Sequence, residues 1–159
     1  MCCSHVLFYL ACQYHPEGFI EGLAGRALRY RSSIKADDIA IFADVHVKHG
    51  SHSIVADRSI SEQARDVLFF GGDVLISTGN RTGDPPDEQE IRAIKISPET
   101  QVLIGSGTNP ENIEHLLAIA DGVIVASYFK EGGAWQNKVS KIRANHFMDC
   151  VRDVREKQN

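Results

Sequence analysis

Two spacings of apolar residues alternate along the chain. Four short runs are nearly all apolar and rich in β-branched residues, which is typical of strands buried on both faces. These predicted strands cover residues 39–47, 73–77, 101–104 and 122–126. The apolar stretch from Val6 to Ala11 is a candidate fifth strand, in addition to these four.

Between these runs, apolar residues recur every three or four positions, as on one side of an amphipathic helix. The first such helix is predicted from Glu17 to Arg31. The later ones begin at residue types that cap helices: Ser59 with Glu62 in capping-box spacing, Asp84 before two prolines, Asn109 before Pro110, and Ser140. The last helix is predicted to bury Ile142, Phe147, Met148, Val151 and Val154.

Strands that alternate with helices imply parallel pairing through right-handed crossovers, so the predicted class is α/β. Four or five strands are enough for an open sheet, whereas a closed (β/α)8 barrel needs eight strands and roughly 250 residues. Periodicity alone therefore favours an open five-stranded parallel sheet.

Composition narrows the class of protein further. The chain has 159 residues, 43% of them hydrophobic and 24% charged, which is enough apolar material for one core. A net charge of −4 gives no broad cationic surface, so nucleic acid is not an expected partner. The apolar stretch from Val6 to Cys12 is far shorter than the ~20 residues of a membrane span. We predict a cytoplasmic protein, or a mitochondrial one if a longer form carries a transit peptide.

Three ionisable residues lie in the first of the four strands. If the strand continues through residue 48, alternation places Asp44, His46 and Lys48 on one face at its C-terminal end, where α/β proteins hold their sites. An acid, an imidazole and an ammonium group suit acid–base catalysis, and we take these three as candidate catalytic residues. The alternative is that Asp44 and Lys48 simply neutralise each other at a strand end.

His46, His49 and His52 are spaced three apart, which invites a zinc interpretation. Neither a Cys-x-x-Cys pair nor a His-Glu-x-x-His motif accompanies them. We therefore assign no metal ligands, and the sequence leaves the cofactor open.

Two loops rich in glycine follow the second and third predicted strands, and the second of them leads directly into a helix. Backbone N–H groups beside a helix start bind anions, and barrels often hold a substrate phosphate at their last strands. The alternative is that the glycines only make tight turns, and Trp135 in the next loop covers either a ligand or the rim. The candidate ligand-binding residues are Thr78, Gly79, Asn80, Gly105, Ser106 and Gly107, with Ser127 and Lys130 after the fourth strand.

Four motifs in this order resemble the BtpA/SgcQ family. They occupy residues 44–49, 78–87, 102–112 and 121–130, and the resemblance runs from about Phe19 to Val151. It implies the C-terminal part of a TIM-type barrel, about strands five to eight, with the N-terminal strands missing. The chain would then be a single partial barrel domain over 1–159 with a divergent segment at 1–16.

The resemblance also bears on function. Cyanobacterial members of the family are linked to photosystem I biogenesis, and a bacterial member is described as a candidate nucleosidase. It implies an enzyme-like barrel that binds a small phosphorylated or nucleoside-type ligand, such as a nucleosidase-like or phosphosugar-processing hydrolase. The alternative is a non-catalytic assembly or stability factor. A truncated isoform, a fragmentary gene model or an assembly of half-barrels would explain the short chain, and an uncovered sheet predicts self-association.

Overall fold

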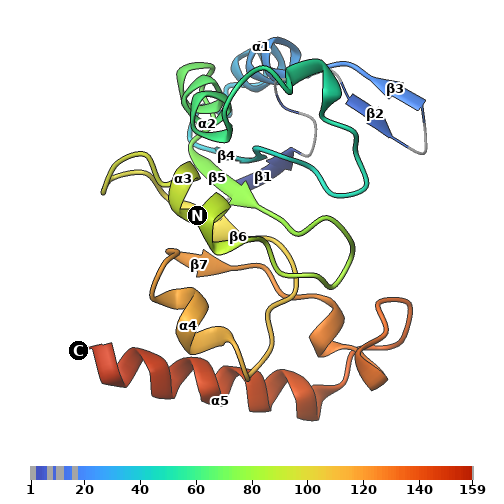
Figure 1. Cartoon of the computed structure of the whole chain (residues 1–159), viewed down its shortest axis with the longest axis vertical. Coiled ribbons are helices and arrows are strands. Elements are labelled where there is room, and N and C mark those ends of the chain that lie inside the picture. The colour runs from blue at the N-terminus through green and yellow to red at the C-terminus, as the bar shows by residue number, and fades with distance from the viewer. Residues whose placement is uncertain (1–2, 7–8, 10–12, 16–17, 159) are drawn as a thin grey trace.

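Five parallel strands form the central sheet of the computed structural model, which describes residues 3–6, 9, 13–15 and 18–158. Each strand of this sheet pairs with the strand of the same sheet that follows it in sequence, so the sheet winds in one direction, as in a barrel (Figure 1). A doubly wound sheet would instead reverse its strand order. The predicted α/β class is confirmed. The strands, in order, are β1 (Cys3–Val6), β4 (Ala40–Asp44), β5 (Val74–Ser77), β6 (Val102–Ile104) and β7 (Gly122–Val123).

Helices follow the strands and pack on one face of the sheet, since the same core contains side chains from both layers. The helices are α1 (Ala24–Ser33), α2 (Ile60–Phe69), α3 (Glu88–Ile94), α4 (Ile113–Leu117) and α5 (Lys141–Gln158), with short 3-10 turns η1 (Ser53–Val55), η2 (Ser127–Phe129) and η3 (Glu131–Gly133). None of the helices in the described residues is long and apolar enough to cross a membrane.

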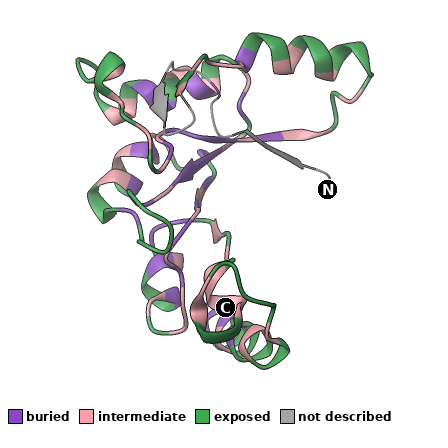
Figure 2. Cartoon of the chain, turned by 90° about the vertical axis from the view of Figure 1, so that its right-hand side faces the viewer, coloured by how far each residue is buried: buried purple, intermediate pink, exposed green. Residues whose placement is uncertain are grey.

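Alternate strand residues supply the core. Ile41, Ala43 and Val45 pack in one cluster with the apolar side of the helices, as alternation along the strand requires. Buried positions follow the central strands, while the outer faces of the helices are exposed (Figure 2). A second cluster lies under α5, around Phe147 and Ile113. The sheet therefore has one face committed to helix packing.

The opposite face of the sheet is less covered. Phe42 and Val74 are half-buried, and Ile124 is 37% exposed. Leu75 belongs instead to the buried core beneath the helices. Part of the apolar interior expected of a closed barrel thus stays accessible to solvent.

Two aspartates fix the N-terminal ends of strands in the same way. The Asp73 carboxylate accepts a hydrogen bond from Ile41 N at 2.7 Å, and Asp73 N donates to Ile41 O at 2.9 Å. The Asp121 carboxylate and N–H group bind Val102 with the same pattern, at 2.8 and 2.9 Å. Each aspartate also pairs with a cation, Asp73 with Arg31 and Asp121 with Lys95.

Several predicted element bounds differ from the structure. Residues 18–20 form β3 (Gly18–Ile20), which pairs with β2 (Gln13–His15) in an antiparallel hairpin, so α1 starts only at Ala24. Backbone pairing with β2 outweighs the helical spacing there. The fourth predicted strand is shorter, because the chain turns into η2 after Ile124 N has bonded Ile104 O. The fifth strand ends at Val6, and most of the predicted Val6–Ala11 stretch lies outside the described residues.

Two of the four predicted caps are confirmed at the helix start itself, and a third, Asn109, caps the turn before its helix. Ser59 and Glu62 form the reciprocal capping box of α2, and Ser140 Oγ accepts from Arg143 N at 3.4 Å in the first turn of α5. Asp84 was the wrong cap for α3, because its helical turn begins only beyond the two prolines, at Asp87. Asn109 caps the turn that leads into α4, because its Oδ1 accepts from Glu111 N and Asn112 N, although the regular helix begins only at Ile113.

The buried side of α5 was predicted correctly for three residues of five. Phe147, Val151 and Val154 are buried, whereas Ile142 is 83% and Met148 42% exposed. Ile142 lies five residues before Phe147, which places it about 140° around the helix from that side chain. One stripe of α5 is thus covered and its flanks are not.

We expect Ser59→Ala to lower the free energy of unfolding by about 1 kcal/mol, because the substitution removes the side chain that caps α2. Chemical denaturation monitored by circular dichroism measures this change. Ser59→Thr keeps a capping hydroxyl and should retain most of the stability. Equal losses in the two variants would show that the capping box contributes nothing.

Candidate functional site

A pocket of about 450 Å³ lies at the C-terminal ends of the strands, where barrel proteins hold their ligands. Its floor comes from two loops, residues 105–109 after β6 and residues 124–128 after β7. Other segments close the sides. The remaining lining residues are Lys48, Thr82, Gly83, Gly133, Trp135 and Arg143.

Lys48 and Ser106 join two sides of this pocket. Lys48 Nζ donates a hydrogen bond to Ser106 Oγ at 3.2 Å. Lys48 follows β4 and Ser106 follows β6, so the lysine side chain reaches past the end of the intervening strand β5. Ser106 is only 7% exposed, and the contact places an ammonium group beside a buried hydroxyl.

The glycines of the β6 loop are required by close packing. Gly107 has φ +71°, and a Cβ there would lie 2.2 Å from Pro85 N. A Cβ on Gly105 would lie 2.7 Å from Thr78 Cγ2. This result supports the tight-turn interpretation of these glycines, although both residues also line the pocket.

The backbone donors before α4 are already engaged. Asn109 Oδ1 accepts from Glu111 N at 3.0 Å and from Asn112 N at 3.1 Å, and Asn112 Oδ1 accepts from Asn109 N at 2.9 Å. These contacts form a closed turn in which the side chains take the place of an anion. An anion in the pocket must therefore bind nearer to residues 105–108 than to the start of α4.

Arg143 adds a second cation to the lining. Its Nε donates to Tyr128 O at 2.6 Å, and its guanidinium carbon lies 4.2 Å from the centre of the Tyr128 ring. Trp135, 68% exposed, stands in the adjoining loop. Lys48 and Arg143 are the charged residues of the lining, which contains no carboxylate and no imidazole. In a chain of net charge −4, this local excess of positive charge favours an anionic ligand.

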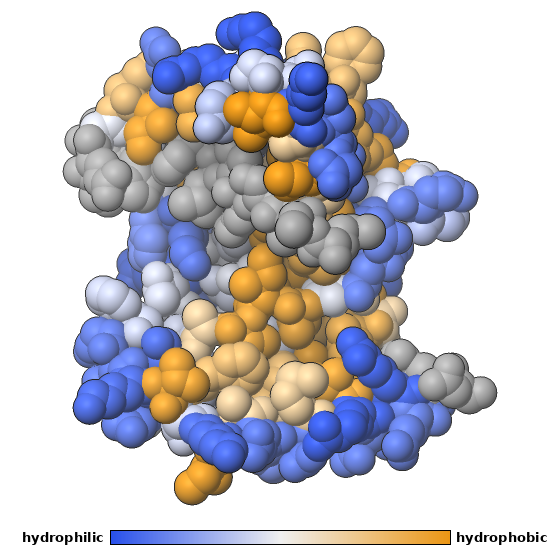
Figure 3. Space-filling model, turned by 180° about the vertical axis from the view of Figure 1, so that it is seen from behind, coloured by the Kyte–Doolittle hydropathy of each residue, from blue (hydrophilic) through white to orange (hydrophobic). Residues whose placement is uncertain are grey.

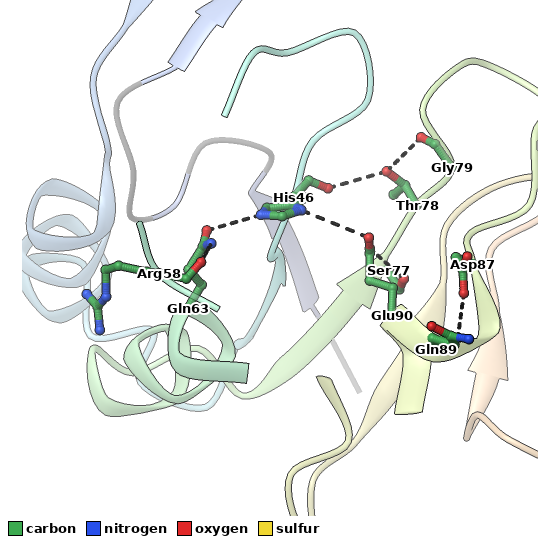
Figure 4. A network of polar contacts seen from close by, with 9 residues as sticks. All are labelled: His46, Arg58, Gln63, Ser77, Thr78, Gly79, Asp87, Gln89 and Glu90. Carbon is green, nitrogen blue, oxygen red and sulfur yellow. Dashed lines mark hydrogen bonds and ion pairs between the residues drawn. The ribbon is translucent and has the colours of Figure 1, made fainter. Parts of the chain in front are cut away.

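His46 lies apart from the pocket lining, in a polar network between the sheet and helices α2 and α3 (Figure 4). Its Nε2 is 3.2 Å from Gln63 Oε1, and its Nδ1 is 4.0 Å from Glu90 Oε2. Ser77 Oγ donates to Glu90 Oε1 at 3.2 Å, and the His46 ring stacks on His52 at 4.1 Å between centroids.

Burial sets the protonation of this network. Desolvation, and to a lesser extent the neighbouring His52, lower the pKa of His46 to about 4, although the Gln63 hydrogen bond acts in the opposite direction. Desolvation likewise raises the pKa of Glu90. His46 is therefore neutral at pH 7, and its contact with Glu90 is not an ion pair between full charges.

The three candidate catalytic residues do not share one face. β4 ends at Asp44, which is 4% exposed and alternates with the helix-facing Ala43. The bend after it turns His46 toward Gln63, whereas Lys48 returns to the pocket. The predicted polar row from Asp44 to Lys48 was thus wrong for His46, because the strand does not continue through residue 48. The catalytic roles themselves stay a prediction.

The histidine spacing does not gather a metal site. His49 Nε2 lies 3.1 Å from Thr82 Oγ1, while His46 and His52 stack on each other. No three His, Cys, Asp or Glu side chains are placed to share a metal ion within the part of the chain that the structure describes.

Of the predicted ligand-binding residues, Gly105, Ser106, Gly107 and Ser127 line the pocket. The others stabilise the loops around it. Thr78 Oγ1 donates to His46 O at 3.4 Å, Gly79 packs against Asp84 O, and Asn80 O accepts from His49 N at 3.1 Å. The Lys130 backbone forms an isolated antiparallel bridge with Val139.

The sequence did not single out Thr82, Gly83 and Arg143. The first two belong to the same glycine-containing motif as Thr78 and extend it toward the pocket. Arg143 follows the Ser140 cap by three residues, but nothing in the spacing indicates which side of α5 faces the pocket.

Known proteins share this fold. The structure described as "Native KDPGal structure", a TIM-barrel-type protein, superposes with a TM-score of 0.56 at 16% identity, over 97% of this chain and 61% of that one. At this identity the likeness concerns the fold alone. The likeness to a TIM-barrel-type structure agrees with the strand order of the sheet, which runs in one direction.

Relatives in sequence extend across most of the chain. An uncharacterised mitochondrial protein of Caenorhabditis elegans is 44% identical over 139 residues, 87% of this chain and 50% of the relative. An uncharacterised protein of Pyrococcus horikoshii is 40% identical over 145 residues, 90% of this chain and 54% of the relative. The photosystem I biogenesis protein BtpA of Synechocystis is 36% identical over 137 residues, 85% of this chain and 47% of the relative.

The chain thus spans about half the length of these relatives. The family model described as BtpA family matches residues 5–153, which include every strand residue of β4 to β7 and every residue that lines the pocket. The chain belongs to the BtpA family.

Proposed function

We propose that the chain binds a small phosphorylated ligand in the pocket formed by the loops after β6 and β7. The observation that carries this proposal is the charge of the lining, where Lys48 and Arg143 occur and no carboxylate is found among the described lining residues. Cationic side chains and exposed backbone N–H groups are the usual ligands of phosphate in proteins.

Individual residues take distinct parts in this proposal. Lys48 supplies a point charge and Ser106 a hydroxyl, already in contact at 3.2 Å. Residues 106–108 line the pocket, and their N–H groups make no hydrogen bond that is seen in the described ranges of the chain, which supports a part for them in binding phosphate oxygens. Ile124 and Trp135 offer apolar surface to the organic part of the ligand.

We propose hydrolysis of a phosphosugar or a nucleoside as the reaction class, with Lys48 and Asp44 as the residues that transfer protons. Lys48 lines the pocket, and Asp44 ends the strand that leads to it. His46 is left out of this proposal because it hydrogen-bonds Gln63 in the helix layer.

A non-catalytic assembly factor is the second candidate function. A groove of about 600 Å³ runs between β7 and α5, lined largely by apolar residues that include Leu103, Val123 and Met148. One relative carries photosystem I biogenesis in its name. A protein that holds partners during assembly would use such a groove rather than the charged pocket.

Self-association is a further part of the proposal. Apolar surface gathers in a band on the rear of the molecule, above the hydrophilic residues at the height of α5 (Figure 3). Partly exposed sheet residues such as Ile124 would gain from burial against another copy.

A cytoplasmic location, or a mitochondrial one for a longer form, stays a proposal from the sequence. The C. elegans relative is named as mitochondrial. Fluorescence imaging of a tagged full gene product would decide between the two locations.

We expect Lys48→Met to weaken the binding of glycerol 3-phosphate about tenfold, because the variant loses a charge-assisted contact. Isothermal titration calorimetry measures the dissociation constant. Lys35→Met, at an exposed lysine after α1, removes the same charge outside the pocket and should leave the dissociation constant for glycerol 3-phosphate unchanged. Equal effects of the two substitutions would contradict a phosphate site at Lys48. Gly107 is unsuited to this test, since any Cβ there would collide with Pro85.

The two candidate functions differ in whether the chain hydrolyses a substrate: an enzyme does, and an assembly factor does not. We expect release of phosphate or base when the chain is screened against sugar phosphates and nucleosides by chromatography, and loss of that release in Asp44→Asn. Absence of turnover together with a stable partner in a pull-down would favour the assembly factor.

We expect the purified chain to elute as an oligomer in size-exclusion chromatography with light scattering, since monomers leave part of the sheet uncovered. An environment-sensitive dye should bind wherever monomer persists. A cooperative monomer that binds no dye would refute self-association.

A further inference from the structure

Arg143 is held in place before any ligand arrives. The hydrogen bond from Nε to Tyr128 O and the stacking on the Tyr128 ring fix the plane of the guanidinium group. An arginine fixed in this way loses little conformational entropy when it binds. The two contacts leave the terminal nitrogens, Nη1 and Nη2, as the donors that a ligand can reach.

The surroundings of Arg143 leave these donors open. None of the ion pairs in the described residues involves Arg143. Gly133 lies beside this end of the side chain, since a Cβ there would be 3.6 Å from Arg143 Nη2, and a residue without a side chain adds no group that could cover it. Both residues line the pocket.

Arg143 and Lys48 approach the pocket from opposite sides. Lys48 follows β4 and reaches toward the β6 loop, whereas Arg143 belongs to the first turn of α5, beyond the edge strand β7. The loops after β6 and β7 lie between the two positions. Lys48 is bonded to Ser106 of the β6 loop and Arg143 to Tyr128 of the β7 loop, so a phosphate placed at Lys48 and Ser106 leaves Arg143 to serve a second anionic group of the ligand.

We infer that Arg143 is a second anion-binding residue, and that the ligand of this pocket carries a planar anionic group such as a carboxylate at the end opposite its phosphate. This inference rests on the proposed phosphate site. The arginine fork binds two oxygens of one carboxylate at the same time, which a lysine does not do. Arg143 would therefore determine which phosphorylated compounds bind.

Two probes that differ in one group test this assignment. Glycerol 3-phosphate and 3-phosphoglycerate share the phosphate end, but the second compound has a carboxylate in place of a hydroxymethyl group. We expect the chain to bind 3-phosphoglycerate about tenfold more tightly by calorimetry, as one additional charge-assisted contact implies. Arg143→Gln should abolish this preference, and any loss of affinity for glycerol 3-phosphate should be smaller than the loss for 3-phosphoglycerate.

Matched variants separate this inference from the proposed phosphate site. Lys48→Met should weaken both probes by the same factor and preserve their ratio. Arg152→Gln, which makes the same change at an exposed arginine of α5, should alter neither affinity. If Arg143→Gln is poorly folded by circular dichroism, Arg143→Lys provides the test, and it should reduce the preference at least threefold because an ammonium group lacks the fork.

Several results would overturn the inference. Equal affinity of the unmodified chain for the two probes, or equal weakening of both in the Arg143 variants, would show that Arg143 does not select a carboxylate. In either case Lys48→Met would still report whether phosphate binds. If neither probe binds the unmodified chain, the phosphate site and the inference built on it both fail.

Discussion

Close approach of two backbone segments determines the shape of the candidate site. The loop after β6 at Gly107 and the loop after β5 at Asp84 and Pro85 come so near that a single Cβ on Gly107 would lie 2.2 Å from Pro85 N. Gly79 meets Asp84 O under the same constraint. Since Ser106 precedes Gly107 and Thr82 precedes this contact, the packing of the two loops decides where both pocket-lining residues stand.

Much of the scaffold was predictable because it depends on local patterns. Apolar runs gave β4, β5 and β6 within two or three residues, and the reciprocal bonds of Ser59 and Glu62 follow from their spacing alone. Errors occurred where something other than apolar spacing decides the element. The hairpin partner of β3 overrides helical spacing, and two prolines shift the start of α3 from Asp84 to Asp87.

The site was predicted less completely for the same reason. Glycine loops at the ends of predicted strands indicated Gly105, Ser106 and Gly107 correctly, since the ends of parallel strands meet at one edge of the sheet. The direction of the His46 side chain depends on the bend after Asp44 and on Gln63 of α2, and neither can be recognised from the spacing of apolar residues in the sequence. The same holds for Arg143, whose contact with Tyr128 joins the first turn of α5 to η2.

The paired aspartates Asp73 and Asp121 divide the molecule into two similar units, each with a helix, a strand, a helix and a strand. In each unit a cation from the preceding segment, Arg31 or Lys95, binds the aspartate that fastens the first strand to the second. Both fastenings lie at the end of the sheet opposite the pocket. These contacts align neighbouring strands at the end of the sheet opposite the candidate pocket, and they use no residue of the loops that line it.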